Sequence, residues 1–510
     1  MTLKRRRFLC AAAAVGVPAA ALLSPALAAN RAASAASAPS ARRPTTSTKP
    51  AAQAAPKPAA PSPATPPSPT PMPNALYQVN IRQHSPEGSL QAVTADLPRI
   101  RALGVDMVWL MPLQPIGQAR RKGSLGSYYS IRDYTAVNPE FGSLEDLKQL
   151  VSRAHALGLK VILDWVANHT AFDHPWITEH PHWYRRNEVG DILAVKANPD
   201  DPQDTEYWED VAQLNFEVHE LWVAMLEAMR FWRREVGLDG FRCDVAAYLP
   251  LRFCEVARQV LEQDGPLFML AEADKPEMHR AGFDATYDWR LQQVLQKIAQ
   301  GQADAQALLE WWVDRVKRYP VGSIGMNFIT NHDINSWHGS DEELYGTPQA
   351  AQAMAVLTAT LPGLPLLYSG QESFSRKRLA FFEKDPVDWG ARTQAEFYTR
   401  LLKWRSSSSA LASALAFDGL EWVPDENPRV ITFKRRGPKG GRLQISVNLS
   451  AQPQKALGRL QLPAWGWHIG PPTPAAKAPP PRTKPKANSN TQRSKNSGPS
   501  GQAASTAKKP

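Results

Sequence analysis

Short apolar runs alternate with amphipathic stretches along the chain from about residue 75 to residue 370. Each run is bounded by turn residues, which is typical of a buried strand. The stretches between them have helical spacing, and the one at 143–158 begins with a capping-box-like Ser143 and Asp146. Strands that alternate with helices predict βαβ units and a parallel sheet. We expect eight strands, at residues 75–82, 105–111, 160–165, 240–245, 266–272, 283–289, 324–330 and 365–370.

The alternation of eight strands with helices fits a closed (β/α)8 TIM barrel better than an open doubly wound sheet. The barrel is expected to span residues 75–410. The pattern breaks at residues 166–217, which are rich in His, Trp, Pro, Asn and Asp and have no sustained period. Loops of this length inside a domain are usually functional, so we expect a short inserted subdomain after strand 3. Weak alternation over residues 411–468 predicts a small C-terminal all-β domain.

The two ends of the chain differ in composition from its middle. Residues 5–9 read RRRFL, an apolar stretch follows, and residues 26–28 read ALA. This pattern predicts a twin-arginine signal peptide over residues 1–28, with a Sec signal or an N-terminal anchor as alternatives. The protein is then exported, either periplasmic or secreted. Residues 29–74 are expected to be a disordered Pro/Ala-rich linker, and residues 469–510 a disordered basic Pro/Lys-rich tail.

The net charge of +11 is carried by these ends. Nine Lys and Arg residues lie in residues 1–74 and eight in residues 471–510, and neither segment holds an acid, which leaves −6 for residues 75–470. A mildly acidic core argues against a nucleic-acid partner. Beyond the signal, no segment approaches the ~20 consecutive apolar residues of a spanning helix, so no membrane span is expected in the mature protein.

An acidic residue lies at or just past the downstream end of each of four predicted strands. A carboxylate at the end of a buried strand is costly unless it has a partner or a task. In a parallel barrel these strand ends form the rim where catalytic side chains converge. Glycoside chemistry needs two such carboxyls, one ionised to attack and one protonated to release the leaving oxygen. For any one of these acids taken alone, the alternative is that it caps a helix or pairs with an arginine. The four acids are Asp164, Asp244, Glu272 and Asp333.

The segments around these acids read DWVANH (164–169), GFRCDV (240–245), AEAD (271–274) and NHD (331–333). In this order, on four strand ends, they resemble the four signature segments of the α-amylase family, glycoside hydrolase family 13. The resemblance extends over about residues 75–468. It implies that Asp244 is the nucleophile, Glu272 the general acid/base, and Asp333 the third carboxylate that binds sugar hydroxyls.

Further positions match the family pattern around these acids. Arg242 lies two residues before Asp244 on the same strand face, so it should share the pocket and help keep Asp244 ionised. Asp164 is expected to be structural and paired with Arg242. The resemblance implies that His169 and His332 contact the sugar. It also implies that Tyr129 stacks on the sugar at the cleavage point, with Tyr128 as the competing residue.

One segment departs from the family pattern. Typical α-amylases carry a Lys-His pair shortly after the nucleophile, whereas residues 244–250 read DVAAYLP. The chemistry requires no cofactor. Asn168 matches a family calcium ligand, so a structural calcium stays open, although one oxygen is a small part of the six to eight that calcium takes. Endo-acting amylase, oligosaccharide-acting α-glucosidase and glucanotransferase all remain open.

The residues together predict a retaining glycoside hydrolase that acts on α-glucosidic bonds of starch or maltooligosaccharides. It would form a covalent glycosyl intermediate on Asp244, with the Asp244 and Glu272 carboxyls about 5–5.5 Å apart. A glucanotransferase that passes the glycosyl group to another sugar is the alternative. A third reading is a non-catalytic sugar-binding protein on an amylase-like barrel. The intact set of three carboxylates argues against that reading.

Overall fold

The computed structural model describes residues 72–412, 419–437 and 440–472. The predicted signal peptide, residues 29–71 of the predicted linker and residues 473–510 of the predicted basic tail lie outside the described residues and stay predictions, whereas Ile469 and Gly470, at the predicted start of the tail, are part of the last strand. Within the described part of the chain, no helix is long and apolar enough to cross a membrane.

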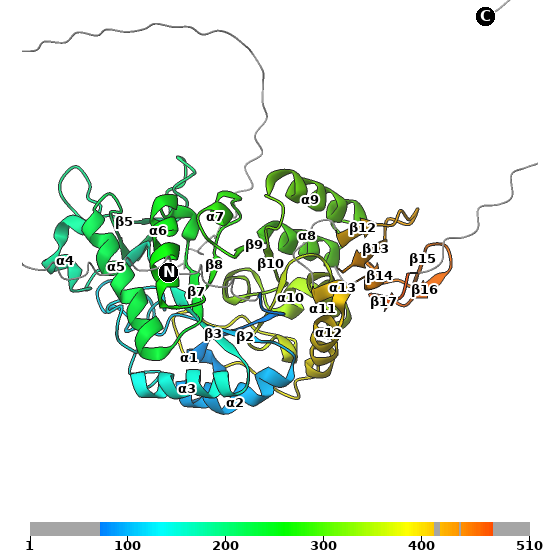
Figure 1. Ribbon diagram of the computed structural model, residues 1–510, viewed down its shortest axis with the longest axis horizontal. Helices are drawn as coiled ribbons and strands as arrows, with labels where there is room; N and C mark the ends of the chain where they lie inside the picture. Colours follow the sequence, from blue (N-terminus) through cyan, green and yellow to red (C-terminus); the bar gives the residue numbers. More distant parts are fainter. Residues whose placement is uncertain (1–71, 413–418, 438–439, 473–510) are drawn as a thin grey trace, which may run out of the picture. The chain divides into compact units, whose positions relative to one another are not determined.

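Eight parallel strands close into a barrel in the order β1-β11-β10-β9-β8-β7-β3-β2 (Figure 1). Every predicted barrel strand is present, and each is buried apart from partly exposed Lys160. Such apolar runs are expected when both faces of a parallel sheet are buried, here by the outer helices and by the side chains that fill the barrel. The (β/α)8 barrel is therefore confirmed. Its strands are β1 (Leu76–Val79), β2 (Met107–Leu110), β3 (Lys160–Trp165), β7 (Gly240–Cys243), β8 (Phe268–Ala271), β9 (Ala285–Tyr287), β10 (Gly325–Asn327) and β11 (Leu364–Tyr368).

Helices form the outer layer around the barrel (Figure 1). The expected capping box is present in α3, where Ser143 N donates to Asp146 Oδ2 at 2.8 Å and Asp146 N donates to Ser143 Oγ at 3.2 Å. The longer helices are α2 (Leu90–Ala102), α3 (Leu144–Ala156), α5 (His219–Phe231), α6 (Leu251–Leu261), α8 (Trp289–Ala299), α9 (Ala305–Arg318), α11 (Pro348–Thr360) and α12 (Ala395–Ser407). Shorter helical turns are α1 (Ile81–His84), η2 (Trp232–Val236), η3 (Ala246–Tyr248), η4 (Glu262–Asp264), α7 (Glu277–Arg280), η5 (Ile334–His338), α10 (Asp341–Tyr345), η6 (Gln371–Ser373) and α13 (Ser409–Ala412).

The inserted segment after β3 contains a small sheet that its irregular sequence did not predict. Its strands are β4 (His169–Ala171), β5 (Ala194–Lys196) and β6 (Tyr207–Gln213), joined antiparallel in the order β4-β6-β5. The short turns α4 (Trp176–Glu179) and η1 (Pro181–Trp183) lie between β4 and β5. Lys122, in the loop after β2, lies 3.2 Å from the buried Asp210 of β6, so this sheet is tied to the barrel mouth.

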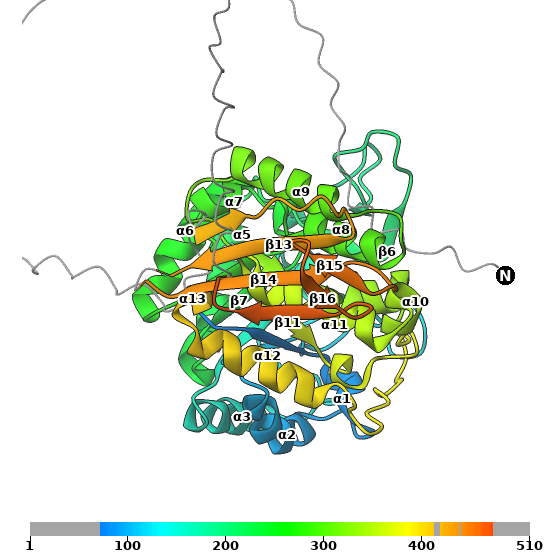
Figure 2. The same cartoon turned by 90° about the vertical axis from the view of Figure 1, so that its right-hand side faces the viewer.

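The C-terminal part is all-β, as expected. A four-stranded sheet has the order β12-β13-β14-β17, and β15 pairs with β16. Figure 2 shows this sheet beside α11 and α12, and Trp467 of β17 contacts Phe397 of α12 with ring centroids 5.4 Å apart. The strands are β12 (Leu420–Trp422), β13 (Val430–Arg436), β14 (Arg442–Asn448), β15 (Gln454–Ala456), β16 (Leu460–Leu462) and β17 (Trp467–Gly470).

Candidate active site

The site is built where β7 and β8 end side by side. A Cβ on Gly240 would lie 1.9 Å from the Phe268 carbonyl oxygen, so only glycine allows the two strands to approach this closely. The ladder continues past the strands, because Glu272 N donates to Cys243 O at 3.0 Å. Asp244 and Glu272 are thus fixed on neighbouring strand ends by backbone hydrogen bonds.

Arg242 lies between three carboxyl groups. Its Nη1 donates to Asp164 Oδ1 at 2.7 Å and to Asp244 Oδ1 at 2.9 Å. Its Nη2 lies 2.8 Å from Glu272 Oε2 as an ion pair. Its Nε donates to the Tyr287 hydroxyl at 3.1 Å, and the whole side chain is buried. The structure therefore brings Arg242 together with Asp164, Asp244 and Glu272, and one guanidinium holds three acids in a single cluster.

Burial changes the protonation of this cluster. It raises the pKa of Asp244 well above its ordinary value, Glu272 adds to the effect, and Arg242 opposes it. Burial also raises the pKa of Asp164 to about 6, again against Arg242. Arg242 therefore acts on Asp244 in the expected direction, but burial outweighs it. One guanidinium faces more than one carboxyl, so the cluster is expected to hold a proton before substrate binds.

A hydrogen-bonded relay runs from β1 to this cluster. Gln78 Nε2 lies 2.7 Å from His332 Nδ1, and His332 Nε2 lies 2.6 Å from the Tyr129 hydroxyl. Tyr129 in turn donates to Asp164 Oδ2 at 3.1 Å. Burial lowers the pKa of His332 well below its ordinary value, and Arg242 adds to this shift. His332 is therefore a neutral imidazole, which can accept at Nδ1 and donate at Nε2.

The structure separates the two candidate tyrosines. Tyr129 lines the cavity at the strand ends, and its ring lies nearly parallel to Phe381 at 6.2 Å and 13°. Tyr128 does not line it, and instead lies under Arg82, whose guanidinium carbon is 4.2 Å from the ring centroid. Tyr129 is thus placed where a sugar ring could contact it, whereas Tyr128 belongs to the protein interior.

The cavity over the carboxylates is narrow, with a volume of about 20 Å³. This is room for about one water molecule. Sequence reasoning missed five residues of the lining, four of which come from loops and the inserted sheet, while Val245 directly follows Asp244. They are Ser127, Trp208, Val211, Val245 and Phe381, and they join the predicted Tyr129, His169, Asp244, Glu272, His332 and Asp333.

Asp333 and His169 both line this cavity. Asp333 is 4% exposed, and its Oδ2 lies 3.3 Å from His332 Nε2. His169 is buried and contacts Trp208 edge to face, with ring centroids 5.9 Å apart. All three predicted carboxylates and both predicted histidines are therefore brought to one cavity.

Asn168, the predicted calcium ligand, lies directly before β4. Its amide nitrogen lies 3.3 Å from His169 Nδ1, and its backbone carbonyl accepts from Leu214. Within residues 72–412, 419–437 and 440–472, no group of three His, Cys, Asp or Glu side chains is placed to hold a metal ion. Calcium stays a prediction, and the chemistry below does not use it.

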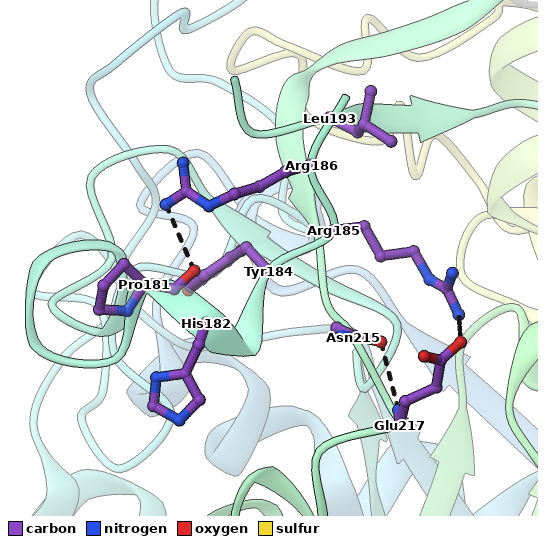
Figure 3. Close-up of a pocket in the computed structure, with 8 residues that line it drawn as sticks. All are labelled: Pro181, His182, Tyr184, Arg185, Arg186, Leu193, Asn215 and Glu217. Carbon is purple, nitrogen blue, oxygen red and sulfur yellow. Dashed lines mark hydrogen bonds and ion pairs between the residues drawn. The ribbon is translucent and has the colours of Figure 1, made fainter. Parts of the chain in front are cut away.

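A larger hollow of about 600 Å³ lies on the inserted subdomain (Figure 3). Glu217, its one carboxyl, faces Arg185 at 3.2 Å, and Arg186 Nη2 donates to the Pro181 carbonyl at 3.3 Å. Two-carboxyl chemistry cannot occur there. The hollow is lined by Pro181, His182, Tyr184, Arg185, Arg186, Leu193, Asn215 and Glu217.

Comparison with known proteins points to the same region of the chain. Residues 72–282 match the family described as alpha amylase, catalytic domain. An alpha-1,4-glucan:maltose-1-phosphate maltosyltransferase of Rhodospirillum rubrum is 30% identical over 417 residues, covering 74% of this chain and 57% of that protein. The alpha-amylase MalA of Haloarcula japonica is 27% identical over 400 residues, covering 74% and 56%. The chain thus spans little more than half the length of these relatives.

Two solved structures are similar over nearly their whole length. An alpha-amylase from Lactobacillus plantarum is 28% identical with a TM-score of 0.69, and the match covers 78% of this chain and 97% of that one. The maltogenic alpha-amylase AmyB from Thermotoga neapolitana is 27% identical with a TM-score of 0.66, covering 74% and 86%.

Proposed function

Since the chain carries a catalytic domain of the α-amylase family, we propose that it cleaves α-glucosidic bonds of maltooligosaccharides with retention of configuration. The observation that carries this proposal is the placement of Asp244 and Glu272 on one guanidinium. Nη1 and Nη2 of Arg242 lie 2.9 Å from Asp244 and 2.8 Å from Glu272. Two neighbouring carboxyls on one counter-charge, one to act as the nucleophile and one as the acid, are the groups that double displacement requires.

The reaction proceeds in two displacements. A carboxylate oxygen of Asp244 attacks the anomeric carbon while Glu272 gives its proton to the leaving oxygen, so a glycosyl ester forms as the glycosidic bond breaks. Glu272 then takes a proton from the incoming hydroxyl, whose oxygen displaces Asp244. Tyr129 lies where it can contact the sugar ring, and Asp333 and His332 lie where they can bind its hydroxyls.

Hydrolysis and transfer differ only in the acceptor of the second step. Hydrolysis of maltooligosaccharides is the first candidate. Transfer to another sugar is the second, and an apolar wall of Trp208, Val211 and Val245 beside the carboxylates favours it, because apolar side chains hold no attacking water by hydrogen bonds. The maltosyltransferase name of several relatives also supports transfer, with maltose 1-phosphate as a candidate donor.

The test uses the full chain and an Asp244→Asn control. Both are incubated with maltoheptaose, and separately with maltose 1-phosphate plus maltoheptaose. Products are followed by chromatography, phosphate assay and early proton NMR. Shorter sugars alone support hydrolysis, longer sugars support transfer, and phosphate release with chain growth supports maltosyl transfer. Initial β-anomers would contradict retention. Equal activity in the control, or no activity on either substrate, would contradict the proposal.

A further inference from the structure

We propose that Val245 positions the general acid/base Glu272, and that strands β5 and β6 of the inserted subdomain hold Val245 in place. This inference rests on the proposed function and adds a residue that does not itself touch the reacting bond. Its evidence is a strained backbone angle, a backbone hydrogen bond and an isolated apolar cluster.

Val245 has a left-handed backbone, with φ 38° and ψ 41°. A β-branched residue is a rare outlier there, since its Cβ crowds the backbone. In this conformation its N–H donates to Glu272 Oε2 at 2.7 Å. Strained backbone persists only where the surroundings hold it, so the packing of Val245 must provide the restraint.

The restraint comes from the inserted sheet. The Val245 side chain belongs to a small apolar cluster with Val195 of β5 and Trp208 and Val211 of β6, separate from the main core. Val195 and Trp208 are register partners, and both are at least 94% buried. Val195 does not line the cavity. Its contact with the catalytic machinery therefore passes through the cluster.

The hydrogen bond determines which oxygen of Glu272 acts. Oε2 receives the Val245 N–H and also faces Arg242 Nη2 at 2.8 Å. An oxygen that faces two donors is the acceptor oxygen of the carboxyl, so the transferable proton must be on Oε1. Val245 and Arg242 thereby orient Glu272 to give its proton from Oε1 to the leaving oxygen.

Two substitutions at Val245 separate positioning from packing. In Val245→Ala the side chain that the cluster holds is lost, and the backbone can relax away from the left-handed region. We expect kcat/KM for maltoheptaose to fall about tenfold. This factor corresponds to the free-energy cost of holding a non-glycine residue in the left-handed region. Glycine adopts positive φ without this cost, so Val245→Gly should retain more activity than Val245→Ala. Packing alone gives the opposite order, because glycine removes more side chain.

A second substrate isolates the proton. Fluoride leaves α-maltosyl fluoride without protonation by a carboxyl, and kcat/KM reports only the first displacement. Val245→Ala should therefore lose activity on maltoheptaose and keep it on the fluoride. Val195→Ala should show the same selective loss to a smaller extent. Val430→Ala is the matched control, since Val430 is equally buried in a small cluster of the C-terminal sheet, and it should leave both substrates unchanged.

The outcomes are distinct. Equal losses on both substrates, or less activity in Val245→Gly than in Val245→Ala, would overturn the positioning role while the proposed function stands. A Val195→Ala variant that matches wild type would overturn the restraint by β5. Wild-type protein that cleaves neither substrate would overturn the proposed function, and this inference with it.

Discussion

Arg242 and Asp164 form an ion pair that is wholly buried, with Nη1 2.7 Å from Oδ1. Loss of one partner of a buried pair typically costs about 3–5 kcal/mol, because the other charge is left uncompensated. Arg242→Met leaves Asp164, Asp244 and Glu272 without their cation, so we expect a large fall in Tm and loss of activity. Asp164→Asn leaves Arg242 with two carboxyls and should cost less. Calorimetry compares the fall in Tm of the two variants. A smaller fall in Arg242→Met than in Asp164→Asn would contradict this prediction.

The two neighbouring tyrosines allow a matched test of the relay. Tyr129→Phe removes the hydroxyl that contacts Asp164 and His332 but keeps the ring. We expect kcat to fall about tenfold, as for loss of a hydrogen bond to a charged group, and Tm to fall as well, because both lost contacts are buried. Tyr128→Phe alters a hydroxyl outside the cavity and should leave kcat unchanged. Equal effects of the two substitutions on kcat would show that the relay has no part in the reaction.

Gly240 should not tolerate a side chain. In Gly240→Ala the new Cβ would clash with the carbonyl oxygen of Phe268, so β7 and β8 must separate. We expect little soluble protein and no activity. Gly237 is the comparison, because its φ is 80° with open space around the added Cβ. Gly237→Ala should cost only about 1–2 kcal/mol of left-handed strain. Soluble, active Gly240→Ala protein would contradict the close approach.

Asp341, at the start of α10, should make stability depend on pH. Burial raises its pKa from 3.8 to about 7, with Ser375 opposing and Glu372 adding to the shift. Between about pH 4 and pH 7 the folded state binds more protons than the unfolded state. The free energy of unfolding should therefore fall as pH rises, by up to about 4 kcal/mol.

The Asp341→Asn variant tests this dependence. The amide can keep the acceptor for Ser375 N, which donates to Oδ2 at 3.1 Å. Its Tm should exceed that of the wild type at pH 8 and should lose the decline between pH 4 and pH 7. Glu342→Gln, an exposed neighbour, serves as the control and should keep the decline. An unchanged profile in Asp341→Asn would assign the slope to other groups.

The barrel could be predicted because its strands are buried on both faces. The three-residue strands β9 and β10 lie within the longer predicted strands 283–289 and 324–330. The inserted sheet could not, because β4 and β5 have three residues each and show no alternation. Their pairing with β6 depends on contacts between distant residues rather than on local pattern.

The same distinction holds for the candidate site. The carboxylates were found because strand ends converge in a parallel barrel. Trp208 and Phe381 were missed because the local sequence of a long loop does not predict the path that its backbone takes. The left-handed backbone of Val245 was hidden for another reason, since valine is a poor indicator of that conformation.

The barrel is closed by its first and last strands, with Leu76 of β1 opposite Leu366 of β11. Nearly the whole catalytic domain must therefore be synthesised before β1 can pair with β11, its second neighbour in the barrel. Until then the nascent barrel has open edges, which are templates for pairing with other chains. Fragments that stop before Leu364 keep such an edge permanently. A truncated form of this protein should therefore extend past β11, because shorter forms are expected to aggregate.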